Sequence, residues 1–116
     1  MAVRLNQTAL RHARSLVHDG KVERDERDDW SEHAPSTDDE NDFIDKNGWT
    51  EYGKWHLGVD DEMDRDEKGH WSFPYGDFAK VHRCAVISLE SRAGQYDHYD
   101  IRDESKKLLE LIDEEG

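Results

Sequence analysis

The sequence predicts a mainly all-α protein, a small helical domain of four or five helices. Apolar residues recur at helical spacing in segments 5–19, 78–93 and 101–112. Glycines follow the first two segments, and residues that often cap helices precede the last two. The chain is only 34% hydrophobic but contains four Trp, four Tyr and three Phe, so an aromatic-rich middle should anchor one modest core.

The first helix is predicted over residues 5–19, and Gly20 should end it, because glycine readily closes a helix. The next segment, 21–35, is dense in charge and is predicted to be an acidic loop. Its one large apolar side chain, Trp30, would fix this loop to the domain.

A short helix should follow the first acidic loop. Ser36 or Thr37 can cap it, acidic residues in its first turn suit the helix dipole, and Gly48 should end it. Another short helix is predicted over 50–57, where Thr50 is the cap and aromatic side chains share one face.

A second acidic loop is predicted over 60–70. Segment 71–75 should be extended, because the residue before Pro74 avoids the helical region, and it has the option of pairing as one short hairpin. Asp77 is then the predicted N-cap of the main helix, 78–93.

The last predicted helix covers residues 101–112, with Asp100 as its cap. Residues 113–116 should form a frayed tail, because chain ends are seldom held by packing. The whole chain, 1–116, is predicted to be a single domain, since its length is that of one ordinary domain.

The chain carries 29 acidic and 16 basic residues, for a net charge of −13. This balance disfavours direct binding to nucleic acid and to anionic membranes, which both need Lys and Arg. Three interpretations of the acidity stay open: a solvated surface, adaptation to high salt in a halophile, and mimicry of nucleic-acid charge toward a basic partner. Mimicry predicts rows of carboxylates at the spacing of phosphates.

Cys84 is the only cysteine, so no disulfide can form within the chain. The first residues lack the apolar core of a signal peptide, and no apolar run approaches the length of a membrane span. We therefore expect a cytoplasmic protein with no membrane contact.

Two ligand-type side chains, His82 and Cys84, lie close together in the sequence. On a helix they would point about 200° apart and would not chelate one ion, so Cys84 is interpreted as a small buried residue. No zinc-finger spacing and no HExxH motif is present. A small metal-binding enzyme or sensor that uses clustered His and Asp residues remains the alternative function. Its candidate ligands are gathered from several segments: His56, His70, His82, Asp60 and Asp77.

No motif for catalysis occurs in the sequence. It has no nucleophile elbow and no phosphate-binding glycine loop. We therefore predict a non-enzymatic protein without a cofactor. Its oligomeric state is left open.

The most unusual feature is the density of aromatic residues between positions 49 and 78. Aromatic side chains anchor small cores, but they also dominate the centres of protein interfaces. The leading functional hypothesis is a protein-binding or assembly module with an unknown protein partner. Its candidate anchors and ion-pairing residues are Trp55, Trp71, Tyr75, Phe78, Arg83 and Arg92.

Four short motifs also carry a resemblance. They are Trp-His-Leu-Gly-Val-Asp at 55–60, Phe-Pro-Tyr-Gly-Asp-Phe at 73–78, Val-His-Arg at 81–83 and Arg-Ala-Gly-Gln at 92–95. Over about residues 29–113 the chain resembles a group of small prokaryotic proteins of unknown activity, some of them encoded among phage or prophage genes. The resemblance implies no catalytic residues, and it favours a particle-associated or host-interacting role.

Overall fold

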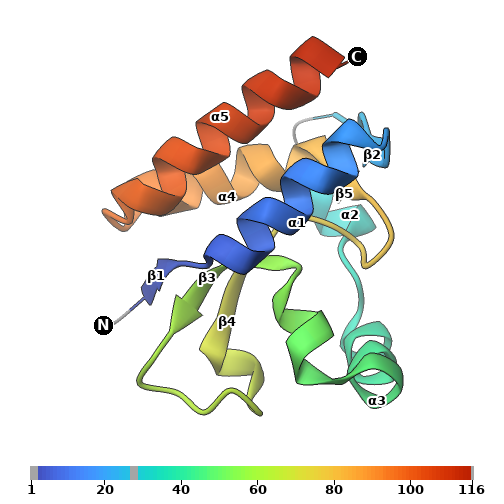
Figure 1. The fold of residues 1–116 in the computed structure, drawn as a ribbon, viewed down its shortest axis with the longest axis vertical. Helices are drawn as coiled ribbons and strands as arrows, with labels where there is room; N and C mark the ends of the chain where they lie inside the picture. The colour runs from blue at the N-terminus through green and yellow to red at the C-terminus, as the bar shows by residue number, and fades with distance from the viewer. Residues whose placement is uncertain (1–2, 27–28, 116) are drawn as a thin grey trace.

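Short β-strands join the helices of this protein, so it is an α+β fold and the all-α prediction was wrong. The computed structural model describes residues 3–26 and 29–115. Its strands form a three-stranded sheet and a separate two-stranded one (Figure 1). Several strands are only two or three residues long, too short to show an alternating apolar pattern in the sequence.

The three-stranded sheet has the order β1-β3-β4, and both pairings are antiparallel. It contains β1 (Val3–Leu5), β3 (His56–Asp60) and β4 (Trp71–Pro74). The predicted extended segment at 71–75 is therefore β4. Its partner β3 contains His56 and Leu57, which the prediction gave to the end of a helix.

Helix α1 (Gln7–His18) begins after β1 rather than at residue 5, because Leu5 still pairs with Gly58 of β3. Asn6 caps the helix by accepting a hydrogen bond from the amide of Ala9. The Asn6 side chain also donates to the carbonyls of Gly53 and His56, each at 3.0 Å. This buried amide therefore ties α1 to the start of β3.

Helix α3 (Thr37–Gly53) replaces the two short helices predicted for this region. Ser36, one of the two caps that the sequence indicated, caps it in a capping box with Asp39. Gly48 was expected to end the helix, but it is a kink with φ of +84°, and the helix resumes beyond it. Aromatic side chains of this region pack inward, and Tyr52 is 2% exposed.

Helix α4 (Arg83–Gln95) begins five residues later than predicted. Asp77 does not cap it. Its carboxylate instead accepts hydrogen bonds from the amides of Ala79 and Lys80 and forms a turn, and Phe78 within this turn has φ of +69°. The chain then enters a short strand before the helix starts.

That short strand, β5 (Val81–His82), pairs in parallel with β2 (Val22–Glu23). The helix α2 (Trp30–His33) follows β2 along the chain. The segment predicted as the first acidic loop thus contains a strand and a helical turn, while its residues 27–28 lie outside the described part of the chain.

Helix α5 (Tyr99–Glu115) runs beside α4, and these two helices form the most extensive contact between elements (Figure 1). Ile101, Leu108 and Ile112 of α5 are fully or almost fully buried in the core. The predicted frayed tail is helical as far as Glu115, and Gly116 lies outside the described residues. The predicted second acidic loop contains the short 3-10 helix η1 (Lys68–His70). Within the described ranges, no helix combines the length and the apolar character needed to cross a membrane.

Candidate metal centre

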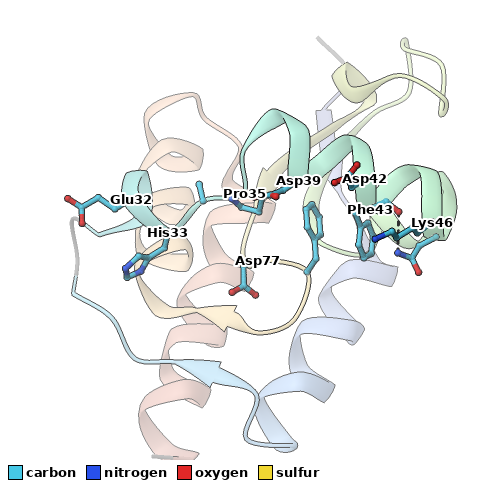
Figure 2. A pocket seen from close by; sticks show the side chains of 11 residues that line it. Glu32, His33, Pro35, Asp39, Asp42, Phe43, Lys46 and Asp77 are labelled. Carbon is cyan, nitrogen blue, oxygen red and sulfur yellow. Dashed lines mark hydrogen bonds between the residues drawn. The ribbon is translucent and has the colours of Figure 1, made fainter.

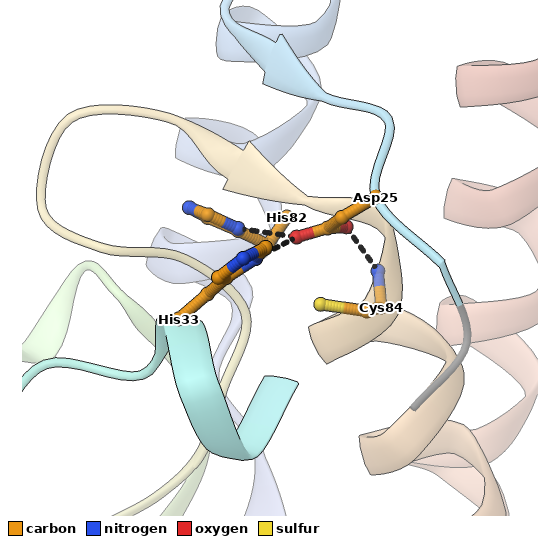
Figure 3. A group of neighbouring side chains, drawn as sticks. All are labelled: Asp25, His33, His82 and Cys84. Atoms are coloured by element: carbon orange, nitrogen blue, oxygen red, sulfur yellow. Dashed lines mark hydrogen bonds and ion pairs between the residues drawn. The ribbon is translucent and has the colours of Figure 1, made fainter. Parts of the chain in front are cut away.

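Four side chains of the types that bind transition metals converge at the junction of β5 and α4. They are Asp25, His33, His82 and Cys84, and their ligand atoms all lie within 4.8 Å of one another (Figure 3). Asp25 follows β2, His33 ends α2, His82 ends β5, and Cys84 lies in the first turn of α4. The cluster therefore joins segments that are distant in the sequence.

The strand pairing explains why Asp25 lies beside Cys84. In the parallel pair, Glu23 is opposite His82, so two residues further along Asp25 comes level with Cys84. The backbone amide of Cys84 donates to Asp25 Oδ1 at 2.9 Å. This amide belongs to the first turn of α4, whose amides lack partners within the helix and favour a negative charge.

The carboxylate of Asp25 lies between the two imidazole rings. Its Oδ2 atom is 2.7 Å from His82 Nδ1 and 2.8 Å from His33 Nδ1. The Asp25 and His82 side chains are 3% and 6% exposed, and Cys84 is fully buried. The His33 side chain is 38% exposed, so the cluster reaches solvent on one side.

A second carboxylate, Asp77, holds the far side of the His82 ring. His82 Nε2 lies 2.8 Å from Asp77 Oδ2, while Asp77 Oδ1 is fixed by its turn. Burial opposes the ionisation of Asp77, but hydrogen bonds from His82 and the turn amides outweigh it and lower its pKa. Metal-binding histidines commonly donate their second nitrogen to such a carboxylate, which aims the first nitrogen at the metal.

The electrostatics of the cluster favour a positive charge at its centre. Burial alone would raise the pKa of Asp25, but hydrogen bonds from the Cys84 thiol and amide and from both histidines hold it well below its usual range. The Asp25 contact raises the pKa of His33. Asp25 is therefore ionised and accepts several hydrogen bonds. A bound cation could replace the hydrogen atoms that these groups share with the carboxylate.

The thiol of Cys84 is not activated as a nucleophile in this arrangement. Burial and the neighbouring Asp25 raise its pKa to about 12, and its side chain is inaccessible to solvent. A reactive cysteine is a partly exposed thiolate beside positive charge. A metal ion would reverse this balance, because coordination deprotonates a thiol.

The donor set suits zinc. A thiolate, two imidazole nitrogens and a carboxylate oxygen can form a four-coordinate tetrahedral Zn²⁺ site. Zinc bond lengths place tetrahedral ligand atoms roughly 3.3–3.8 Å apart. The distances from Asp25 Oδ2 to the two histidine nitrogens are shorter than this range, whereas the four ligand atoms together span up to 4.8 Å. Side-chain shifts of about an ångström would therefore complete the tetrahedral geometry.

The structure brings together only part of the metal site predicted from the sequence. His82 and Asp77 are in contact, as described above. His56 Nδ1 is instead bonded to the Tyr52 carbonyl, and His70 Nδ1 to the Met63 carbonyl, at 2.9 and 2.8 Å. Asp60 accepts from the Glu62 amide in a local turn. None of these three belongs to the group that the described residues form.

Sequence reasoning missed Asp25 and His33 and dismissed Cys84. Asp25 and His33 were assigned to a solvated loop, where acids and histidines are ordinary. His82 and Cys84 would diverge only if both lay on a helix, whereas His82 is extended, with φ of −101° and ψ of 122°. The closely spaced His82 and Cys84 were the signal that could have indicated the site.

The residues predicted to bind a protein partner are placed differently from one another. Trp55 and Tyr75 are 5% and 0% exposed and stack on each other in the core at 5.4 Å between ring centroids. Trp71 and Phe78 are half-buried. Arg83 forms an ion pair with Asp113, and Arg92 lies exposed on α4.

A cavity of 630 Å³ adjoins the cluster. His33 and Asp77 form part of its wall, and Phe43 and Phe78 stack within it at 4.3 Å between centroids (Figure 2). The charged side chains that complete the lining are Glu32, Asp39, Asp42 and Lys46. The cavity is therefore mostly negative and lies on the side where the cluster is exposed.

Comparisons with protein-family models, with curated proteins and with solved structures found no match to this chain.

Proposed function

We propose that this protein binds a transition-metal ion, with Zn²⁺ as the best fit, through Asp25, His33, His82 and Cys84. The observation that supports this most directly is the convergence of four metal-type ligand atoms within 4.8 Å. Sulfur and imidazole ligands select zinc and its neighbours over magnesium and calcium.

The placement of Asp77 adds independent support. Its carboxylate fixes His82 Nε2, so that Nδ1 faces the other three donors. A buried histidine with a purely structural role is satisfied by one hydrogen-bond partner. His82 instead contacts two carboxylates, Asp25 and Asp77. The pair resembles the outer hydrogen bond that orients histidine ligands in metal sites.

Metal binding would tie the segment containing β2 and α2 to the start of α4. This segment contacts the rest of the protein through the two-residue pairing of β2 with β5, through Asp25, and through the ring of Trp30, whose centroid lies 5.5 Å from that of His82. A bound ion would add bonds to Asp25 and His33 in this segment. Part of its binding free energy would therefore stabilise the fold.

The test is metal content and ligand identity. Protein purified from zinc-supplemented cells should contain one zinc ion per chain by elemental analysis. The cobalt-substituted protein should show tetrahedral d–d bands and a thiolate-to-cobalt charge-transfer band. Cys84→Ser should abolish the charge-transfer band, and Asp25→Asn should lower the metal content.

Asp61→Asn is a matched control, because Asp61 is an exposed carboxylate whose partner is Arg4, outside the cluster. It should bind metal like the wild-type protein. A wild-type protein that takes up neither zinc nor cobalt while remaining folded would overturn the proposal. The protein-binding and nucleic-acid-mimic hypotheses stay predictions.

A further inference from the structure

His33 differs from the other three members of the cluster in its exposure. Its side chain is 38% exposed, whereas those of Asp25 and His82 are 3% and 6% exposed and Cys84 is fully buried. It also lies on α2, a single helical turn of four residues without a side-chain hydrogen bond at its N-cap. The other ligands are held more firmly by β5, α4 and the amide of Cys84.

The two histidines are also oriented differently. His82 is fixed at both ring nitrogens, by Asp25 and by Asp77. His33 is fixed at Nδ1 alone, and within the described ranges its Nε2 has no hydrogen bond. Outer hydrogen bonds restrain a metal-binding imidazole, so His33 lacks the restraint that His82 has.

His33 belongs both to the metal-type cluster and to the lining of the cavity of 630 Å³ (Figures 2 and 3). Movement of this ring would open the cluster toward the cavity. The other charged lining residues are the carboxylates of Glu32, Asp39, Asp42 and Asp77, with Lys46 as the only cation among the described lining residues. This excess of negative charge disfavours anions and admits neutral or cationic groups.

We propose that His33 is an exchangeable ligand, and that its coordination position opens onto the cavity and accepts an imidazole-type nitrogen donor. This inference rests on the proposed metal site. In the exchange, the bond from the metal to His33 Nδ1 breaks and a bond to the incoming neutral nitrogen forms. Asp25, His82 and Cys84 keep the ion in place, as the three protein ligands of open zinc sites do.

The experiment uses the cobalt-loaded full-length chain as wild type, as His33→Ala and as the control His18→Ala. His18 is an exposed histidine on α1 that does not belong to the cluster. Circular dichroism checks that each variant is folded. Each sample is titrated first with imidazole and then, separately, with azide, and the cobalt spectrum is followed.

We expect His33→Ala to keep its thiolate-to-cobalt band while binding cobalt at least about tenfold more weakly, since even an outer partner of a ligand has that effect. Imidazole should restore the wild-type spectrum, and azide should change it little. In His18→Ala the tethered His33 holds this position at high effective concentration, so the imidazole concentration that restores His33→Ala should leave the spectrum of His18→Ala unchanged.

The inference is overturned if folded His33→Ala holds no cobalt under conditions that load the wild type. It also fails if the cobalt spectrum of His33→Ala ignores imidazole, or responds to azide as strongly. Failure of the wild-type protein to bind either metal is a different result, because it removes the proposed function itself.

Discussion

Two buried histidines of this protein have opposite surroundings. His82 lies between the carboxylates of Asp25 and Asp77. His56, only 3% exposed, contacts the backbone carbonyl of Tyr52 and the ring of the same residue, whose centroid is 4.5 Å away. Burial alone therefore does not indicate a site. The difference lies in the groups that face the imidazole.

The two surroundings have different electrostatic consequences. Burial lowers the pKa of His56 to about 4, against the opposing effect of its hydrogen bond to the Tyr52 carbonyl, so this region excludes positive charge. The region around His82 contains two ionised carboxylates and is suited to hold positive charge. Metal addition should accordingly stabilise the protein through His82 and its neighbours and leave the His56 region unaffected.

The largest expected effect is stabilisation by zinc. At a free zinc concentration about a thousandfold above its Kd, the free energy of unfolding should rise by about 4 kcal/mol, because the ion binds the folded chain. Denaturant unfolding with zinc and with a chelator measures this difference. Asp25→Asn and Cys84→Ser should remove most of it, whereas Asp61→Asn should retain it. Equal stability with zinc and with chelator in the wild type would contradict the prediction.

A smaller effect is expected from pH in the metal-free protein. Unfolded His56 takes up a proton below about pH 6.5, but the folded residue does so only below about 4. Within this window the unfolded state binds more protons, so stability is full above pH 6.5 and falls as the pH falls toward 4. At 1.36 kcal/mol per pKa unit, the loss amounts to about 3 kcal/mol.

His56→Asn tests this contribution, because the amide of Asn can donate to the Tyr52 carbonyl but does not titrate. Its unfolding free energy should fall about 3 kcal/mol less than that of the wild type between pH 6.5 and 4. If the unfolding free energies of His56→Asn and of the wild type fell equally between pH 6.5 and 4, His56 would not be the group that causes the pH dependence.

The third effect concerns the outer carboxylate of the cluster. Asp77→Asn should weaken zinc binding about ten- to hundredfold, or about 1.4–2.7 kcal/mol, because His82 loses its charged partner. The amide oxygen of Asn can still accept from the amides of Ala79 and Lys80, so the turn should persist. Competition with a chromogenic zinc chelator measures the affinity. An unchanged Kd in Asp77→Asn would show that Asp77 serves the turn alone.

The contrast between the two histidines also explains what the sequence could and could not predict. The apolar stripes of α1 and α5 and the Ser36 cap are local patterns, and the structure contains them. The strands were missed because the pairing of Val3–Leu5 with β3, and of Val22–Glu23 with β5, joins residues far apart in the chain. No local pattern contains such a contact.

The candidate site depends on those same pairings. Asp25 reaches Cys84 only because β2 is in register with β5, and His82 faces Asp25 only because α4 begins at Arg83 rather than at Phe78. An error of five residues in the start of a helix therefore hid the metal-type cluster. His82 and Asp77 were named as candidates from residue type alone, and their partners depended on tertiary structure.

The smallest effect is expected at the aromatic neighbour of His56. Tyr52→Phe keeps the ring that packs on the imidazole and removes the hydroxyl that donates to Glu40 at 3.4 Å. Loss of this long, half-buried hydrogen bond should lower the unfolding free energy by about 1 kcal/mol or less. The pH dependence assigned to His56 should be unchanged, because burial is the main cause of its lowered pKa. If unfolding curves of Tyr52→Phe lost that pH dependence, the Tyr52 hydroxyl rather than burial would be what keeps His56 neutral.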